Sequence, residues 1–172
     1  EELISNSTAA QATKTGAISS FDVDGYTTGA NGAINANSDT YVAWCWKVNG
    51  GTTTSNGDGS RSSTVQANTK GGFSIVEWTG DGSTATIGHG LNAAPELIIV
   101  KTKTAVSDWP VYCSGLTSAA YRLVLNSNSG ENTTNDEWNS TDPTSTVFSV
   151  GSGGNVSGSG QDFVGYCFHS VA

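Results

Sequence analysis

The sequence predicts an all-β, antiparallel fold with essentially no helix, most simply two packed sheets in a β-sandwich or jelly roll. Short apolar runs alternate with stretches rich in Gly, Ser, Thr and Asn, which is the composition of strands joined by turns. Two runs, Tyr41–Trp46 and Phe163–Phe168, are apolar at successive positions. Because successive side chains of a strand point to opposite faces, each run should be a central strand covered on both sides.

Strands are expected throughout the C-terminal part of the chain, and turn residues separate them. They cover residues 73–79, 84–87, 96–103, 109–113, 121–126, 146–150 and 162–170. The run Pro95–Val100 behaves like the two aromatic runs, so it should also be buried within a sheet.

An internal repeat organises the chain. Residues 29–46 align without gaps to residues 151–168, at an offset of 122, with matches of volume and polarity such as Tyr41 with Phe163 and Cys45 with Cys167. Upstream, residues 3–7 resemble residues 123–127 at an offset of 120. Residues 1–48, the first copy, therefore repeat residues 121–170, the second copy.

This repeat predicts the domain organisation. Residues 1–48 should be the C-terminal strands of an upstream repeat, 49–70 a polar linker, and 71–172 a complete β-sandwich repeat. We therefore expect a piece of a longer protein. Because the first copy holds terminal strands apart from the rest of their repeat, strand complementation between chains or domains is also expected.

Composition excludes several classes of function. The net charge is −8, and no cluster of Lys or Arg supplies the positive field that nucleic acid or an anionic membrane requires. No apolar run approaches the roughly 18 residues needed to span a bilayer. The three cysteines are an odd number without CxxC spacing, so free thiols are expected rather than a zinc site, with a Cys45–Cys167 disulfide as the alternative.

The sequence offers little that favours catalysis. His89 lies between two glycines and is expected to be a turn residue bonded to the backbone, not a base or metal ligand. Asp136, Glu137 and Asp142 could be paired carboxylates of a glycosidase, but a solvated acidic loop explains them as well. There is no Gly-x-Ser-x-Gly turn on a strand that leads into a helix. We therefore predict that the chain is not an enzyme.

Aromatic and polar residues lie together at two places that could recognise a glycan. Trp109 follows Asp108, and Trp138 lies beside Asp136 and Asn139; in each case the ring could stack on a sugar while the polar groups bind hydroxyls. The alternative is that both rings fill the core, because five Trp in a small sandwich must be buried somewhere.

No cofactor is expected, although a structural calcium could occupy a loop. The candidate loops are Asp22–Gly25 and Asp58–Gly59, and each is explained as well by a turn between strands.

Several segments together resemble the repeat domain of large structural proteins of marine bacteriophages. They are Ser20–Tyr26, Tyr41–Lys47, Gly72–Gly82, Ile87–Leu91 and Ala94–Lys101, which match in order over nearly the whole chain. The resemblance implies a virion protein with lectin-like, concanavalin-like β-sandwich domains, and it supplies no catalytic residues. The second copy departs from the pattern, since Tyr166 and Phe168 replace Trp.

The sequence and the resemblance together predict a non-enzymatic structural protein of the virion, in a tail fibre or other appendage or in the capsid decoration, which could also recognise host-surface glycan. Its expected partners are copies of itself, as a homo-oligomer, other virion proteins and host-surface polysaccharide, with no nucleic acid and no membrane insertion. Two other classes stay open: a bacterial carbohydrate-binding or adhesion module, and a glycan depolymerase.

Overall fold

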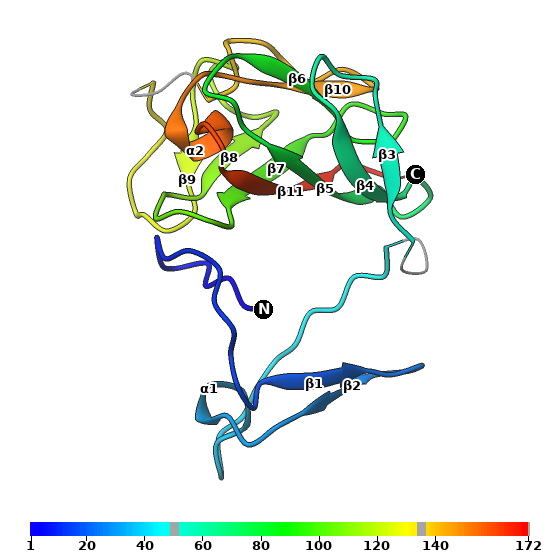
Figure 1. Cartoon of the computed structure of the whole chain (residues 1–172), viewed down its shortest axis with the longest axis vertical. Helices are drawn as coiled ribbons and strands as arrows, with labels where there is room; N and C mark the ends of the chain where they lie inside the picture. The colour runs from blue at the N-terminus through cyan, green and yellow to red at the C-terminus, as the bar shows by residue number, and fades with distance from the viewer. Residues whose placement is uncertain (49–51, 134–136, 172) are drawn as a thin grey trace. The chain divides into compact units, whose positions relative to one another are not determined.

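A computed structural model describes residues 1–48, 52–133 and 137–171, and it divides the chain into two compact units. The first unit comprises Glu1–Glu2 and Gln11–Trp46. The second comprises Leu3–Ala10 and the chain from Lys47 onward (Figure 1).

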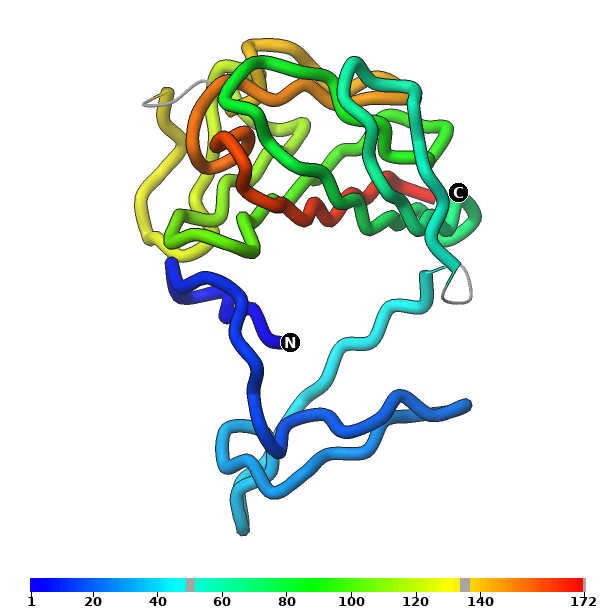
Figure 2. Tube along the Cα trace, in the orientation of Figure 1, coloured from blue at the N-terminus to red at the C-terminus, as the bar shows by residue number. Residues whose placement is uncertain are grey.

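The second unit is built on a seven-stranded sheet in which every neighbouring pair is antiparallel. In spatial order its strands are β3 (Thr54–Asn56), β4 (Ser63–Asn68), β5 (Phe73–Thr79), β11 (Asp162–Phe168), β7 (Leu97–Thr102), β8 (Pro110–Cys113) and β9 (Leu123–Val124). The last strand of the chain, β11, therefore lies at the centre of the sheet, where the red end of the trace runs in Figure 2.

A smaller sheet covers one face of the large one. It pairs β6 (Ala85–Gly88) with β10 (Val147–Val150), and the helical turn α2 (Gly154–Ser157) follows β10. Ile87, Phe148 and Val150 of the small sheet belong to the same buried cluster as Val76 and Ile98 of the large sheet. Two sheets thus enclose one core, and the predicted all-β antiparallel sandwich is confirmed.

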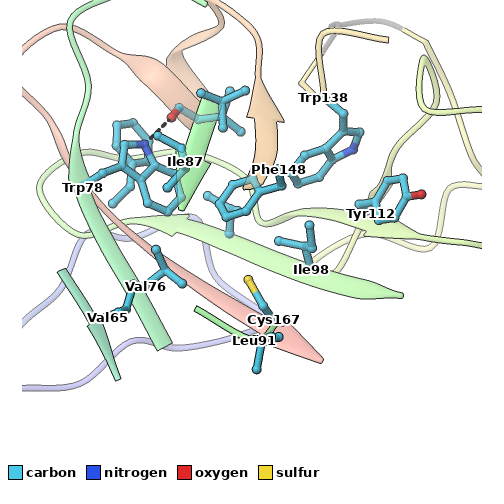
Figure 3. Packing of buried hydrophobic residues seen from close by; sticks show 14 of the residues in the cluster. Val65, Val76, Trp78, Ile87, Leu91, Ile98, Tyr112, Trp138, Phe148 and Cys167 are labelled. Atoms are coloured by element: carbon cyan, nitrogen blue, oxygen red, sulfur yellow. Dashed lines mark hydrogen bonds between the residues drawn. The ribbon is translucent and has the colours of Figure 1, made fainter. Parts of the chain in front are cut away.

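Aromatic contacts order this core (Figure 3). The Trp78 ring stacks on Phe163 at a centroid distance of 5.5 Å and meets the edge of Phe148 at 5.6 Å. Its Nε1 donates a hydrogen bond of 3.0 Å to the Val156 carbonyl, which ties the helical turn α2 to the sheet. A buried indole N–H thereby finds the partner that it requires.

The strands observed at 73–79 and beyond agree with those predicted, with β9 shortened to two residues. The predicted polar linker over 49–70 differs from the structure, because residues 54–56 and 63–68 form β3 and β4. A strand that is covered on one face needs apolar side chains on that face only, and in β4 Val65 and Ala67 supply them while Thr64 and Gln66 are polar. Residues 49–51 lie outside the described part of the chain.

The first unit contains a two-stranded sheet and a helical turn. β1 (Ile18–Phe21) pairs with β2 (Tyr26–Thr28), and α1 (Gly32–Asn35) follows with Asn31 as its N-cap. All four residues of β1 are exposed, and Phe21 is 82 % exposed. A two-stranded ribbon without a covered face is only marginally stable alone.

The two copies share backbone features at the offsets that the sequence predicts. At the offset of 120, the antiparallel bridge of Glu2 with Ala12 corresponds to that of Arg122 with Asn132. At the offset of 122, α1 corresponds to α2.

Two further features recur between the copies. The positive φ of Ser38, 69°, recurs at Gly160, also at 69°. The hydrogen bond from the Gly29 amide to the Ala17 carbonyl has its counterpart between Gly151 and Glu137. One backbone framework is therefore present twice.

The second copy contains a buried ion pair between Arg122 and Glu137. The carboxylate of Glu137 is fully buried and also accepts a hydrogen bond of 2.9 Å from the side chain of Asn155. Two charges removed from water are stable only if each satisfies the other.

Glu137→Ala should lower the free energy of unfolding by about 3–5 kcal/mol, because it leaves the Arg122 charge buried without its carboxylate. Urea denaturation followed by far-ultraviolet circular dichroism measures the loss. The matched control is Glu96→Ala, at an exposed position, which should change stability by less than about 0.5 kcal/mol. Equal losses in both variants would contradict a structural role for the pair.

Candidate functional site

The structure places both candidate sugar-stacking rings in the core. Trp138 is 2 % exposed and meets the Tyr112 ring edge to face at 5.9 Å, and Trp109 is 5 % exposed. Neither ring presents a face on which a sugar could stack. The glycan-binding interpretation of these two tryptophans is therefore wrong, because the sandwich uses their large apolar surface to fill its interior.

The polar candidates beside them have structural partners. Asp108 accepts a hydrogen bond from the Asn126 side chain, and Asn126 in turn accepts from the Trp109 amide. Asn139 lies in a turn with φ of 50°, where its backbone carbonyl accepts from the Thr141 hydroxyl. Asp136 lies outside the described residues.

Trp109 also fixes the segment Leu3–Ala10 to the rest of the second unit. Its Nε1 donates to the Ser7 carbonyl at 2.9 Å, and the ammonium group of the buried Lys101 donates to the Thr8 carbonyl at 3.1 Å. The composition of the segment gave no sign of this contact, because its partners are backbone carbonyls, which every residue carries.

His89 is fully buried in a bonded turn, as the sequence predicted. Its Nδ1 accepts a hydrogen bond from the Leu91 amide, so its other nitrogen, Nε2, carries the proton and donates to the Thr144 carbonyl at 3.2 Å. Burial lowers the pKa of His89 below its usual value, and the Thr144 carbonyl and Asp58 oppose this shift only in part. Both ring nitrogens of His89 are therefore hydrogen-bonded to backbone groups.

The remaining acidic candidates are likewise engaged in the fold. Glu137 pairs with Arg122, and Asp142 accepts a hydrogen bond of 3.0 Å from the Tyr112 hydroxyl. Burial together with this bond raises the pKa of Tyr112 to about 12.

The first candidate calcium loop is held by internal hydrogen bonds, and the cysteines do not form a disulfide. In the first loop Asp22 accepts from the hydroxyls of Ser20 and Thr27. Across the described ranges, no three His, Cys, Asp or Glu side chains gather as a metal site would require. The cysteines are free thiols there, so the alternative Cys45–Cys167 disulfide is not formed.

A shallow polar hollow of about 340 Å³ lies beside β4, β5 and β11. Hydroxyl side chains and the ion pair of Lys103 with Glu77 line it, and its two aromatic residues, Trp78 and Phe163, are buried. Without an exposed ring, the hollow lacks the stacking surface that sugar recognition commonly uses.

The most unusual surface of the molecule is the aromatic segment of the first copy, Tyr41–Trp46. Sequence analysis predicts a buried central strand here, and the structure corrects that prediction. Val42 is 78 % exposed and Trp44 is 75 % exposed. Among the described residues, Val42–Cys45 take part in no strand and no bridge.

The counterpart of this segment in the second copy has the opposite environment. β11 pairs with β5 on one side and with β7 on the other, and Phe163 and Cys167 on it are 0 % exposed. The same sequence pattern is therefore buried where flanking strands are present and exposed where they are absent. Pattern alone predicts the character of the strand, whereas its burial depends on neighbours that residues 1–46 do not include.

No helix in the described ranges combines the length and the apolar character that crossing a membrane requires.

The free energy of unfolding should fall as the pH drops below about 6.5, by up to about 1.4 kcal/mol per pH unit. The unfolded chain takes up a proton at His89 in this range, while the folded chain, in which the pKa is lowered, resists it. Urea titrations between pH 8 and pH 5 measure the slope, and His89→Asn should reduce it. An unchanged slope in His89→Asn would contradict the assignment.

Comparisons with known proteins place the chain in a family without supplying a function. No curated protein and no solved structure matches it. The family described as "Domain of unknown function (DUF7483)" matches residues 1–172, and so spans both copies of the repeat. The chain therefore belongs to the DUF7483 family.

Proposed function

We propose that the chain is a non-enzymatic structural module of a bacteriophage virion, in a tail fibre, another appendage or the capsid decoration. Two lines support the proposal. The motifs from Ser20–Tyr26 to Ala94–Lys101 resemble the repeats of marine phage structural proteins. In addition, one backbone framework occurs twice at a nearly constant offset, as is usual in proteins that build extended arrays from modules.

The observation that carries the proposal is the exposed aromatic segment Tyr41–Trp46. Soluble monomers rarely leave contiguous apolar side chains in water, and such patches usually mark surfaces of association. Its Val42 and Trp44 side chains are largely exposed, and Val42–Cys45 take part in no strand. A surface of this kind suits assembly with other modules better than it suits binding of a small substrate.

The partners proposed here are copies of this module and other proteins of the particle, in a homo-oligomeric arrangement at the virion surface. The net charge of −8 favours solubility and opposes contact with packaged nucleic acid. Binding of host polysaccharide is left out of the proposal, because Trp109 and Trp138 are buried.

Purified particles of the phage that encodes the chain should contain it in stoichiometric amounts. Mass spectrometry of gradient-purified virions after trypsin digestion should detect the peptide Thr104–Arg122, which lies between two cleavage sites. Its abundance relative to a known capsid peptide should stay constant across the gradient peak, whereas that of a host ribosomal peptide should not.

A chain found only in the soluble fraction of the infected lysate would overturn the proposal. Detection on the surface of uninfected bacterial cells would instead favour the adhesion module.

A further inference from the structure

We propose that Tyr41–Trp46 is the central strand of another repeat: it inserts between the strands corresponding to β5 and β7 of the repeat that lies ahead of it in the same polypeptide. This inference deepens the proposed structural role, because it names the partner of the exposed segment, and it rests on that role only for the setting in the virion.

The segment corresponds residue by residue to β11. The elements that lead into the two strands correspond as well, since α1 and α2 lie at an offset of 122 and the positive φ angles of Ser38 and Gly160 follow at the same offset. The backbone therefore enters Tyr41–Trp46 by the same route by which it enters β11.

β11 is paired along both of its edges. Tyr166 lies opposite Ile75 of β5 and opposite Ile99 of β7, and every residue from Phe163 to Phe168 has a partner on both strands. A strand in this position contributes donors and acceptors along both edges, so its counterpart in the first copy requires two flanking strands.

The register assigns a face to each side chain of the segment. Tyr41, Ala43 and Cys45 correspond to Phe163, Gly165 and Cys167, which point into the core between the two sheets. Val42 and Trp44 correspond to Val164, which is buried, and Tyr166, which is half-buried on the opposite face. Both faces of the segment are apolar, as a position covered on both sides requires.

The partner is a preceding repeat rather than the sheet of a second copy of this chain. In this chain the place between β5 and β7 is already filled by β11. The position that corresponds to Gly165 admits only a small residue, because a Cβ there would lie 3.1 Å from the Trp78 ring, and the segment has Ala43 at this position, which requires a small shift of the equivalent ring.

Sequence register gives the order of the segments. Residue 1 corresponds to residue 121. In the proposed arrangement, the residue of the preceding repeat that corresponds to residue 120 is therefore followed directly by residue 1.

Cys45 reports on the insertion directly. Its thiol is exposed, whereas that of its counterpart Cys167 is fully buried, and burial raises the pKa of Cys167 to about 12. After digestion with trypsin the two cysteines lie on different peptides. Thr15–Lys47 contains Cys45 as its single cysteine, and the peptide from Leu123 onward contains Cys167 as its single cysteine. Alkylation by iodoacetamide can therefore be followed for each thiol within one sample, with Cys167 as the internal reference.

The experiment compares the full chain with a tandem chain in which residues 47–120 are fused ahead of Glu1 of the full chain. In the full chain the thiol of Cys45 should be alkylated at nearly the same rate as the thiol of Cys45 in the chain unfolded in urea. In the tandem chain its alkylation should slow at least about 100-fold, as expected for a group that reacts only after local opening.

Three variants of the tandem chain make the result specific. Ala43→Asp places a charge in the core and should restore the reactivity of Cys45. Ala30→Asp is the matched control, since its counterpart Ser152 is exposed, and should leave Cys45 protected. Ala43→Gly removes the Cβ that approaches the ring corresponding to Trp78, and it allows insertion even if that contact is too close.

Protection of Cys45 in the tandem chain, or in its Ala43→Gly form, supports the proposal. Reactivity equal to that of the full chain in both would overturn it. Protection that appears in the full chain alone as its concentration rises would identify a second copy as the partner and would overturn the choice of a preceding repeat. None of these outcomes depends on finding the chain in virions, so the two proposals can fail separately.

Discussion

The fold depends on β11, the last strand of the chain, which lies between β5 and β7. Its inward side chains form much of the core: Phe163 stacks on Trp78, and Cys167 is fully buried. Gly165 completes this face, because any side chain there would approach the Trp78 ring. The large sheet is continuous only when residues 162–168 join strands formed by residues 73–102, so its folding requires long-range pairing.

The same requirement explains why the first copy does not form a sheet of the same kind. Residues 1–46 provide counterparts of β10, α2 and β11 but none of β5 or β7, the two strands between which β11 lies. A Val side chain contributes roughly 1.5–3 kcal/mol when it is fully buried, and this contribution is absent while Val42 is exposed. The turns of the first copy form nonetheless, because their hydrogen bonds join residues that are close in sequence, such as those within α1.

Much of the fold could be predicted from the sequence, because alternation and turn residues report on local geometry. The strands between Phe73 and Phe168 follow from short apolar runs bounded by Gly, Asn, Asp and Pro. β3, which is the edge strand, and its neighbour β4 could not be found by composition, because a strand with apolar side chains on one face only has the overall composition of a polar linker. Only the alternation of Val65 and Ala67 with polar residues marks β4.

The candidate site was less predictable, because the exposure of a side chain depends on which segments of the folded chain pack against it. Trp109 and Trp138 have polar residues beside them in sequence, which resembles a binding rim, yet the sandwich buries both rings. Tyr41–Trp46 shows the reverse: its pattern is that of a buried strand, and its side chains are exposed. In both cases the deciding contacts come from segments remote in sequence.

The proposed place of Tyr41–Trp46 defines where one repeat ends and the next begins. The segment would complete the sheet of the repeat ahead of it, whereas the sheet that starts at β3 already contains its own central strand, β11. Each repeat would then close its own core, as in ordinary arrays of domains, and the chain that follows Trp46 would join one repeat to the next. A strand with partners along both edges leaves its sheet only when two ladders of hydrogen bonds break, so strand pairing would hold the C-terminal strand of each repeat in place.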